Sequence, residues 1–284
     1  MTDEVFFDHR ELLFSIVYGM LGSVADTEDV LQETWMAWSG RRSAELPEHP
    51  RAYLVRVAVN QALARRKTLS TRRETYYGPW LPEPLVAGAD EPVERAESLS
   101  MALLVVLETL TPLERAVFVL HEAFGYQLTE IAAILGRSAA SVRQLAHRAR
   151  EHVRARRPRQ SPDPALKREL TERFTRAAFG GDMAALLEIL APEVTLWSDG
   201  GGKATAAGPR PIHGRDNVAR LLMNRTAKPF AGLDIRYRRV NGEPSAVIFV
   251  GEEPFAVMVL DLEDDQVKGI YVVTNPDKLT TIAK

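Results

Sequence analysis

The chain has 284 residues, enough for two or three domains that each bury a core of their own. Its net charge of −2 and its charged fraction of 26% are ordinary for a water-soluble globular protein. It contains no cysteine, which excludes disulfides, thiol redox switches and cysteine-ligated zinc. The start Met1–Glu4 is acidic, and no apolar stretch approaches the length of a membrane span. We therefore expect a cytoplasmic protein without a signal peptide or membrane association.

Two helices are predicted over residues 7–38. Gly22 should end the first helix, and Asp26 is expected to cap the second. The stretch 11–40 has no lysine or arginine, whereas acids cluster on the second helix beside tryptophans. Such a face suits a protein partner better than DNA, although acids in the first turn of a helix are common without any partner.

The charge then reverses, since residues 41–73 carry nine Lys/Arg against two acids. Pro50 is expected to begin a third helix that presents Arg51, Arg56 and Asn60. An acidic helix followed by a basic one predicts contacts with a protein and with a nucleic acid.

The segment 110–159 predicts a helix-turn-helix. Thr111 and Pro112 begin its first helix, and Gly125 and Gly136 end the first and second. The inward face of its third helix is expected to consist of Val142, Leu145, Ala146, Ala149 and Val153. The stretch 137–159 contains eight arginines and one acid, which is typical of a surface facing DNA phosphates. A helical bundle with a solvated charged face is the simpler alternative.

Residues 74–99 are predicted to be an acidic linker, because prolines at their density hold a chain extended and out of helix. This stretch also contains Tyr76, Tyr77 and Trp80, and such side chains usually dock on a surface. A disordered tether with incidental aromatics is the alternative.

Residues 159–284 predict an α+β domain. Helices are expected to end at Gly180-Gly181, to cover 186–190 and to span 215–226, with a strand at 194–197 and β-rich runs at 233–240, 245–250 and 255–273. Helices followed by an antiparallel meander imply a curved sheet wrapped on helices.

The order of motifs resembles a sigma-70-family RNA polymerase sigma factor of the small extracytoplasmic-function class. The matching stretches are Asp29-Val30-Leu31-Gln32-Glu33-Thr34-Trp35, then Pro50-Arg51-Ala52-Tyr53-Leu54 leading to Asn60, then the helix-turn-helix. The resemblance implies an all-α sigma region 2 over 1–73 and an all-α region 4 over 100–158. In this family, region 2 binds the clamp helices of RNA polymerase and the −10 element. Region 4 binds the −35 element and the polymerase flap.

Carried over residue by residue, the resemblance assigns polymerase binding to Asp29, Gln32 and Glu33, and −10 binding to Arg51, Arg56 and Asn60. It assigns −35 binding to Arg137, Ser141, Arg143, Gln144, His147 and Arg148. The chain departs from the family at Leu145, where many members have arginine.

The last domain, 159–284, resembles the cone-shaped SnoaL-like branch of the NTF2-like superfamily, and one sigma subgroup carries this extension. Its three signatures are Trp80-Leu81-Pro82-Glu83-Pro84, Asp199-Gly200-Gly201-Gly202-Lys203 and Asn275-Pro276-Asp277-Lys278-Leu279. In the subgroup the extension controls promoter activation in cis and replaces a separate anti-sigma factor.

We expect the three signatures to meet in one interdomain regulatory contact. Burial of Trp80 should supply most of the docking energy, with Lys203 and Lys278 facing Glu83, because exposed ion pairs contribute only ~0–1 kcal/mol each. A small-molecule ligand in the cone would shift the population of the active factor by favouring one docked state.

Two other functions remain open. One is a stand-alone helix-turn-helix regulator with a ligand-binding effector domain. The other is a DNA-tethered SnoaL-like enzyme, in which Asp199 would be a general base beside Lys203, with His213 as a further candidate. The sequence shows no metal-ligand spacing, and its glycine run does not lead into a helix as a phosphate site would. We therefore expect a sigma factor without enzyme activity, cofactor or metal.

Overall fold

The computed structural model describes residues 2–41, 47–86, 99–156, 163–204, 207–226 and 232–282. These residues form two compact units. Of the described residues, unit 1 holds 2–41, 47–74, 99 and 103–156, and unit 2 holds 75–86, 100–102, 163–204, 207–226 and 232–282. The start of the expected linker is thus part of unit 2. The remainder of that linker and the expected boundary near residue 158 lie outside the described residues.

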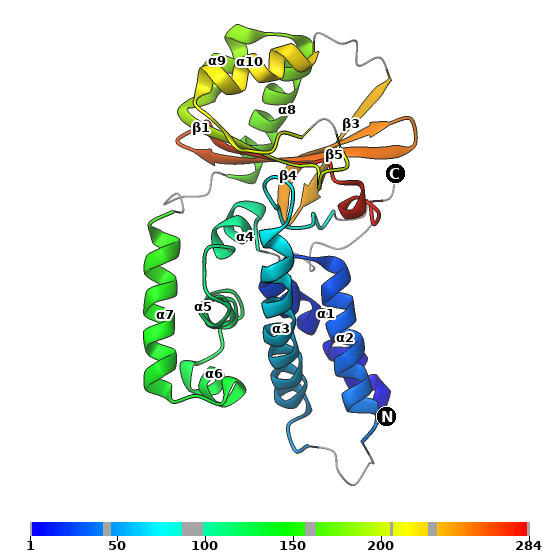
Figure 1. Ribbon diagram of the computed structural model, residues 1–284, viewed down its shortest axis with the longest axis vertical. Helices are drawn as coiled ribbons and strands as arrows, with labels where there is room; N and C mark the ends of the chain where they lie inside the picture. The colour runs from blue at the N-terminus through cyan, green and yellow to red at the C-terminus, as the bar shows by residue number, and fades with distance from the viewer. Residues whose placement is uncertain are drawn as a thin grey trace. The chain divides into compact units, whose positions relative to one another are not determined.

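The helices of the first half of the chain follow the expected order (Figure 1). They are α1 (Thr2–Leu21), α2 (Val24–Ser39), α3 (Pro50–Glu74), α4 (Met101–Leu107), α5 (Pro112–Phe118), the π-helical turn η3 (Val119–Ala123), α6 (Leu128–Leu135) and α7 (Ala139–Arg154). The predicted helix starts at Pro50 and Pro112 are confirmed, whereas α4 was not predicted.

Helix ends in unit 1 follow local backbone chemistry. Gly22 and Gly136 adopt φ angles of +69° and +62°, the left-handed region in which glycine has no steric cost, and each ends a helix as predicted. The predicted cap at Asp26 is wrong. Ser23 has the extended backbone of a cap and its hydroxyl accepts a hydrogen bond from the Asp26 amide at 3.3 Å, so Asp26 already lies in the first turn.

One apolar core joins the helices of unit 1. It includes Leu13 of α1, Leu54 of α3 and Val117 of α5, all fully buried. The predicted inward face of α7 is confirmed, since Val142, Leu145, Ala146, Ala149 and Val153 are all buried. The helices of the two expected sigma regions therefore pack together in one body.

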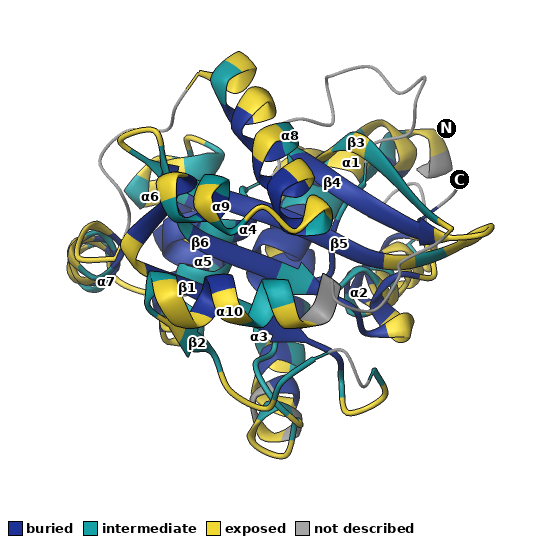
Figure 2. Ribbon diagram, turned by 90° about the horizontal axis from the view of Figure 1, so that it is seen from above, coloured by how far each residue is buried: buried dark blue, intermediate teal, exposed yellow. Residues whose placement is uncertain are grey.

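Unit 2 is an α+β fold with a six-stranded sheet. Its elements are α8 (Pro164–Gly180), α9 (Met183–Ile189), β1 (Leu190–Asp199), β2 (Ile212–His213), α10 (Arg215–Thr226), β3 (Leu233–Val240), β4 (Glu243–Val250), β5 (Glu253–Glu263), β6 (Gln266–Val273) and the 3₁₀ turn η4 (Pro276–Lys278). The three helices lie against one face of the sheet, where Phe174, Leu260 and Ile270 are buried (Figure 2).

The strand order is β2-β1-β6-β5-β4-β3. The predicted antiparallel meander is confirmed for β3 to β6, and one bulge in β5 and one in β6 bend the sheet. β1 pairs in parallel with β6, which was not predicted, and it runs on to Asp199, two residues beyond the strand predicted at 194–197. The parallel register sets Asp199 beside Val273, so the second signature lies next to the start of the third.

Within the described part of the chain, no helix has the length and apolar character needed to cross a membrane. The same residues contain no group of three His, Cys, Asp or Glu side chains arranged to hold a metal ion.

Candidate functional site

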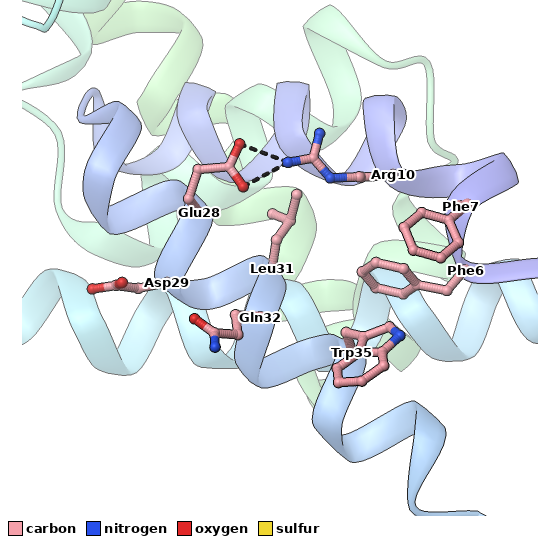
Figure 3. A pocket seen from close by; sticks show the side chains of 8 residues that line it. All are labelled: Phe6, Phe7, Arg10, Glu28, Asp29, Leu31, Gln32 and Trp35. Atoms are coloured by element: carbon pink, nitrogen blue, oxygen red, sulfur yellow. Dashed lines mark hydrogen bonds and ion pairs between the residues drawn. The ribbon is translucent and has the colours of Figure 1, made fainter. Parts of the chain in front are cut away.

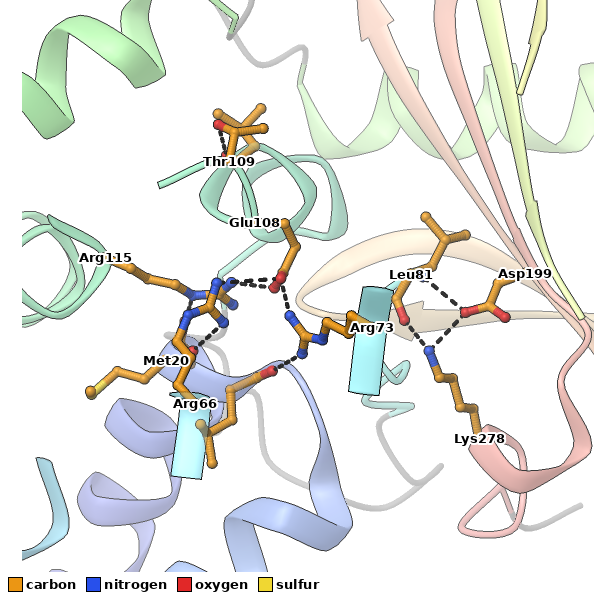
Figure 4. Close-up of polar contacts among 12 residues, drawn as sticks. Met20, Arg66, Arg73, Leu81, Glu108, Thr109, Arg115, Asp199 and Lys278 are labelled. Carbon is orange, nitrogen blue, oxygen red and sulfur yellow. Dashed lines mark hydrogen bonds and ion pairs between the residues drawn. The ribbon is translucent and has the colours of Figure 1, made fainter. Parts of the chain in front are cut away.

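Asp199 is the centre of a hydrogen-bonded site in unit 2. Its side chain is fully buried, and both carboxylate oxygens have two donors each. Oδ1 accepts from the Tyr76 hydroxyl at 2.6 Å and the Gly201 amide at 3.1 Å. Oδ2 accepts from the Leu81 amide at 2.8 Å and the Lys278 ammonium at 2.7 Å (Figure 4). Because these donors occupy the carboxylate, Asp199 is not placed to act as a general base toward an external substrate.

The segment after β6 closes over the end of β1. The backbone amides of Thr274 and Asn275 donate to the Asp199 carbonyl at 2.8 and 3.0 Å. The Asn275 side chain donates to the Tyr76 hydroxyl at 2.9 Å and caps η4 by accepting from the Asp277 amide. This turn positions Lys278 against Asp199.

Lys278 is the cation of the site and is 9% exposed. Its ammonium donates to the Leu81 carbonyl as well as to Asp199. It also lies 4.1 Å from the centroid of the Trp80 ring and 5.3 Å from that of Tyr76, within cation–π distance. A buried carboxylate is costly unless it is paired, and Lys278 provides that pairing.

Two glycines allow the loop after β1 to close. Gly201 has φ +59°, and a Cβ there would lie 2.3 Å from the Asn275 side-chain nitrogen. A Cβ on Gly200 would lie 2.5 Å from that of Ala207. The run of glycines therefore serves close backbone approach, as expected, rather than phosphate binding.

The first signature contacts the other two, but through different side chains than predicted. Trp80 is only half-buried, whereas Leu81 is 1% exposed and Pro82, Glu83 and Pro84 are buried. Lys203 is exposed and pairs with Asp277 at 2.8 Å instead of facing Glu83. Docking therefore rests on Leu81 and the buried Asp199–Lys278 pair.

Sequence reasoning had not assigned Tyr76 or Asn241 to the site. Burial, together with the hydrogen bond and charge of Asp199, raises the pKa of the Tyr76 hydroxyl, so it stays a donor. Asn241 makes two hydrogen bonds with Leu85. Its backbone amide donates to the Leu85 carbonyl at 2.8 Å, and its side-chain oxygen accepts from the Leu85 backbone amide at 3.2 Å. The signal for Tyr76 was the density of aromatics in a proline-rich stretch. His213, the other catalytic candidate, pairs with Thr195 at 3.0 Å.

The side chains expected to bind the −35 element lie on or just before α7. Arg137, Arg143, Gln144, His147 and Arg148 are exposed, and Ser141 is half-buried. Arg148 also pairs with Glu114 at 3.1 Å while remaining 62% exposed. Leu145 is 6% exposed and belongs to the core, so its side chain does not face outward.

The three residues expected to bind the −10 element lie on α3. Arg51, Arg56 and Asn60 are all exposed. The Asn60 amide nevertheless donates to the carbonyl of Ile134 in α6 at 3.2 Å, and to that of Arg56 at 2.8 Å. One face of α3 thus contacts the helix-turn-helix within unit 1.

The residues expected to bind polymerase, Asp29, Gln32 and Glu33, are exposed on α2. Asp29 pairs with Arg65 of α3. A pocket adjoins this face, and Figure 3 shows that it lies between α1 and α2. Its lining residues are Phe6, Phe7, Arg10, Glu28, Asp29, Leu31, Gln32 and Trp35. Sequence reasoning missed the contribution of α1, which exposes 60% of Phe7.

Comparisons with known proteins agree with this layout. The model for Sigma-70 region 2 matches residues 6–72, and that for Sigma-70 region 4 matches residues 100–153. The chain is 37% identical over 287 residues to the ECF RNA polymerase sigma factor SigJ of Mycobacterium tuberculosis, covering 95% of this chain and 91% of that protein. It is 31% identical to the probable ECF RNA polymerase sigma factor SigI of the same species, covering 95% and 92%.

The crystal structure of M. tuberculosis SigJ matches with a TM-score of 0.78 at 32% identity, over 99% of this chain and 98% of that one. The match spans both units, and it confirms the expected fold class of all-α sigma regions 2 and 4 followed by an α+β SnoaL-like domain. The α7 face, the α2–α3 surface and the buried site of unit 2 are therefore parts of a chain that belongs to the extracytoplasmic-function RNA polymerase sigma factors.

Proposed function

We propose that this sigma factor directs RNA polymerase core to specific promoters and that unit 2 controls this activity in cis. The observation that carries the first part is the division of α7 into two faces. Its apolar face is buried in the core, and its polar face presents arginines, an amide and a histidine to the surroundings. These side chains read base edges and phosphates in a major groove.

The proposal divides the other contacts between α2 and α3. On α2, exposed Asp29, Gln32 and Glu33 suit a basic protein surface such as the polymerase clamp helices. On α3, Arg51 and Arg56 suit the phosphates of the −10 element. The polymerase flap would bind near the helix-turn-helix, and the protein would act in the cytoplasm with the polymerase.

Control in cis is supported by the site around Asp199. The Leu81 segment stands between the sigma regions in sequence, and it is held by the Asp199 loop and the Lys278 turn. A contact made within one chain needs no separate anti-sigma factor. Deleting residues 275–284 removes Lys278 and Asn275, and we predict that it lowers transcription. A small-molecule ligand of unit 2 stays a prediction.

Run-off transcription with RNA polymerase core tests the proposed function. Transcript from the promoter upstream of the gene should appear only when the chain is added. The double variant Arg143→Ala/Gln144→Ala should lower the yield about thirtyfold or more, because each of the two base contacts contributes roughly 1–3 kcal/mol. Arg154→Ala is the matched control, since Arg154 is an exposed arginine of the same helix outside the assigned set.

A protected DNA footprint without polymerase, together with no chain-dependent transcript, would instead support a stand-alone regulator. The enzyme alternative would need turnover that Asp199→Asn abolishes, and the occupied carboxylate of Asp199 gives it no support.

A further inference from the structure

β3 lies at one edge of the sheet in unit 2, on the far side from β2 (Figure 2). One side of the strand pairs with β4. In the described part of the chain its other side makes a single bridge, between Val240 and Val86 of the linker. The N–H and C=O groups along a strand edge form a template for pairing with another extended segment. β3 therefore offers a docking surface along most of its length.

The register of the β3–β4 hairpin shows which backbone groups of β3 point outward. Val240 pairs with Glu243 across a two-residue turn, so even-numbered residues of β3 direct their N–H and C=O groups at β4. Odd-numbered residues direct theirs away from β4. The linker contact agrees with this, because Leu85 receives the outward amide of Asn241. In the middle of the strand the outward groups are those of Ile235, Tyr237 and Arg239.

The side chains of β3 are strongly basic. Arg236 and Arg238 lie over the Phe249 ring on one face of the sheet, 4.9 and 5.8 Å from its centroid. Arg239 belongs to the other face and is exposed. Asp234 is the one acid of the strand, and it pairs with Arg236 at 2.7 Å. Because three arginines outweigh this aspartate, a segment that docks on β3 should be acidic.

The linker already begins to pair with β3. Leu85 directs both its amide and its carbonyl at Asn241, at 3.2 and 2.8 Å, and Val86 bridges Val240 in the antiparallel sense. The residues that follow, 87–98, lie outside the described residues, and their sequence contains four acids and one arginine. The direction of the chain and its charge thus both favour this segment as the partner of β3.

Counting on from the bridge gives the register that such pairing would have. Asp90 would fall opposite Arg236 and diagonal to Arg238, at a spacing where opposite charges attract. Leu85 points its backbone groups at the hairpin, so the other odd-numbered linker residues would also face β3. Pro92, which has no N–H to donate, falls at an even-numbered position. It would therefore leave no hydrogen bond of the ladder unmade.

We propose that the edge of β3 binds the acidic linker segment 87–93 as a seventh, antiparallel strand of the sheet. The bridge at Val86 is the first pair of this ladder. The charge of β3 selects this segment over a second copy of the chain, because two β3 strands would set arginines against arginines. Docking also covers an edge that would otherwise favour aggregation. The inference concerns unit 2 and does not rest on the proposed function.

Hydrogen exchange of single amides in the full-length chain tests the pairing. The outward Tyr237 amide pairs with Ala89, so in the wild type it should exchange about tenfold or more slowly than an unpaired amide. Ala89→Pro removes an N–H that faces β3 and should return the Tyr237 amide to the unpaired rate. Gly88→Pro is the matched control, because the N–H it removes faces away from β3. A Tyr237 amide that exchanges in the wild type as if unpaired would overturn the proposal.

The charge of the segment gives a second readout. Asp90→Asn/Glu91→Gln should speed exchange of the Tyr237 amide about threefold or more, because it removes the acids nearest the arginines. Asp264→Asn/Asp265→Asn is the control, since it removes two acids from an exposed turn whose positive φ angles suit asparagine. An equal effect of both variants would contradict selection by charge. Protection of Tyr237 that appears only at raised protein concentration would assign the edge to a second copy instead.

A disulfide tests the register. The chain has no cysteine, so Gly88→Cys/Arg238→Cys introduces its only thiols. In the proposed ladder these positions lie directly opposite each other on one face, within reach of a disulfide. In Gly88→Cys/Tyr237→Cys the second thiol belongs to the other face. Oxidation should therefore cross-link the first pair several-fold faster than the second, and equal rates would overturn the proposed strand.

Discussion

Glu108 in unit 1 and Asp199 in unit 2 are both largely or fully buried carboxylates, and their partners differ in charge. Glu108 is surrounded by three guanidiniums, whereas Asp199 has one ammonium, one hydroxyl and two backbone amides. The stability of the Glu108 site depends on charge balance, because loss of its carboxylate leaves three cations close together. The stability of the Asp199 site depends on backbone geometry, since turns and glycines place its donors. The two sites should therefore respond differently to the same kind of change.

The largest loss of folding stability is expected for Glu108→Gln. It removes the negative charge and leaves Arg66, Arg73 and Arg115 to repel one another, and breaking a buried pair typically costs about 3–5 kcal/mol. Hydrogen exchange should show faster exchange of α1, α3 and α5 amides. Glu122→Gln is the control, because Glu122 and its partner Arg150 are both over one-third exposed, and it should leave the exchange of those amides unchanged. Wild-type protection in the Glu108 variant would mean that the carboxylate does not balance the cluster.

Asp199→Asn should have a smaller effect, confined to unit 2. The amide loses the charge that pairs with Lys278, and its NH2 group must face two of the donors that the carboxylate accepts from, at a cost of about 3 kcal/mol. The amides of Leu81 and Asn275 should then exchange faster than in the wild type. Lys203→Ala is the control, because its pair with Asp277 is exposed and contributes ~0–1 kcal/mol. Equal effects of the two substitutions would contradict the buried pairing.

Gly201→Ala tests the dependence on shape without changing charge. The new methyl group would meet the Asn275 side chain, and the backbone sits at φ +59°, so we expect a loss of about 1–3 kcal/mol in unit 2. Thermal melting monitored by the Trp80 environment measures it. Gly251→Ala has a similar φ of +61° and open space around the new carbon, so it isolates the backbone cost. An equal loss in both variants would remove the role of the Asn275 contact.

The stability of the two units should change with pH in opposite directions, falling in acid for unit 1 and falling toward neutral pH for unit 2. Burial alone would raise the pKa of Glu108, but the charges of Arg115, Arg66 and Arg73 outweigh it and lower that pKa in the folded chain. Its contribution is therefore present above the unfolded value and is lost as the pH falls. Burial raises the pKa of Asp261 in β5 to about 6, so the folded state binds more protons than the unfolded state and unit 2 loses stability as the pH rises from about 4 to 6.

The Asp261 effect is the smallest expected, about 1–2 kcal/mol after allowance for partial exposure. Asp261→Asn should flatten the pH dependence of unit 2 between pH 4 and 6 while leaving that of unit 1 unchanged. Hydrogen exchange measured as a function of pH reports the stability of each unit separately, so it distinguishes the pH dependence of unit 2 from that of unit 1. An unchanged slope in the Asp261 variant would assign the pH dependence to another group.

The features predicted best from sequence are local ones. The buried face of α7 follows from helical periodicity alone, and the helix ends at Gly22 and Gly136 follow from residues that accept positive φ. The meeting of Leu81, Asp199 and Lys278 could be anticipated only through the family resemblance. Their individual partners depend on the turn after β6, which the sequence pattern did not reveal.

The features that sequence did not reveal are long-range. The parallel pairing of β1 with β6 joins strands about 70 residues apart, and nothing local distinguishes β1 from an antiparallel strand. Glu108 stands in a stretch with no unusual composition, and its three arginines come from two helices. Ser23 and Asp26 are both good capping residues, so only the backbone conformation decided between them.

The most direct test of the account is run-off transcription with RNA polymerase core, comparing no added chain, the wild-type chain and Asp199→Asn. We predict transcript only with the chain, and a yield lower by about fivefold or more for the variant, because the Leu81 segment is no longer held by Asp199. A wild-type yield from the variant would contradict control by unit 2 in cis. Absence of any chain-dependent transcript would contradict the account of promoter recognition itself.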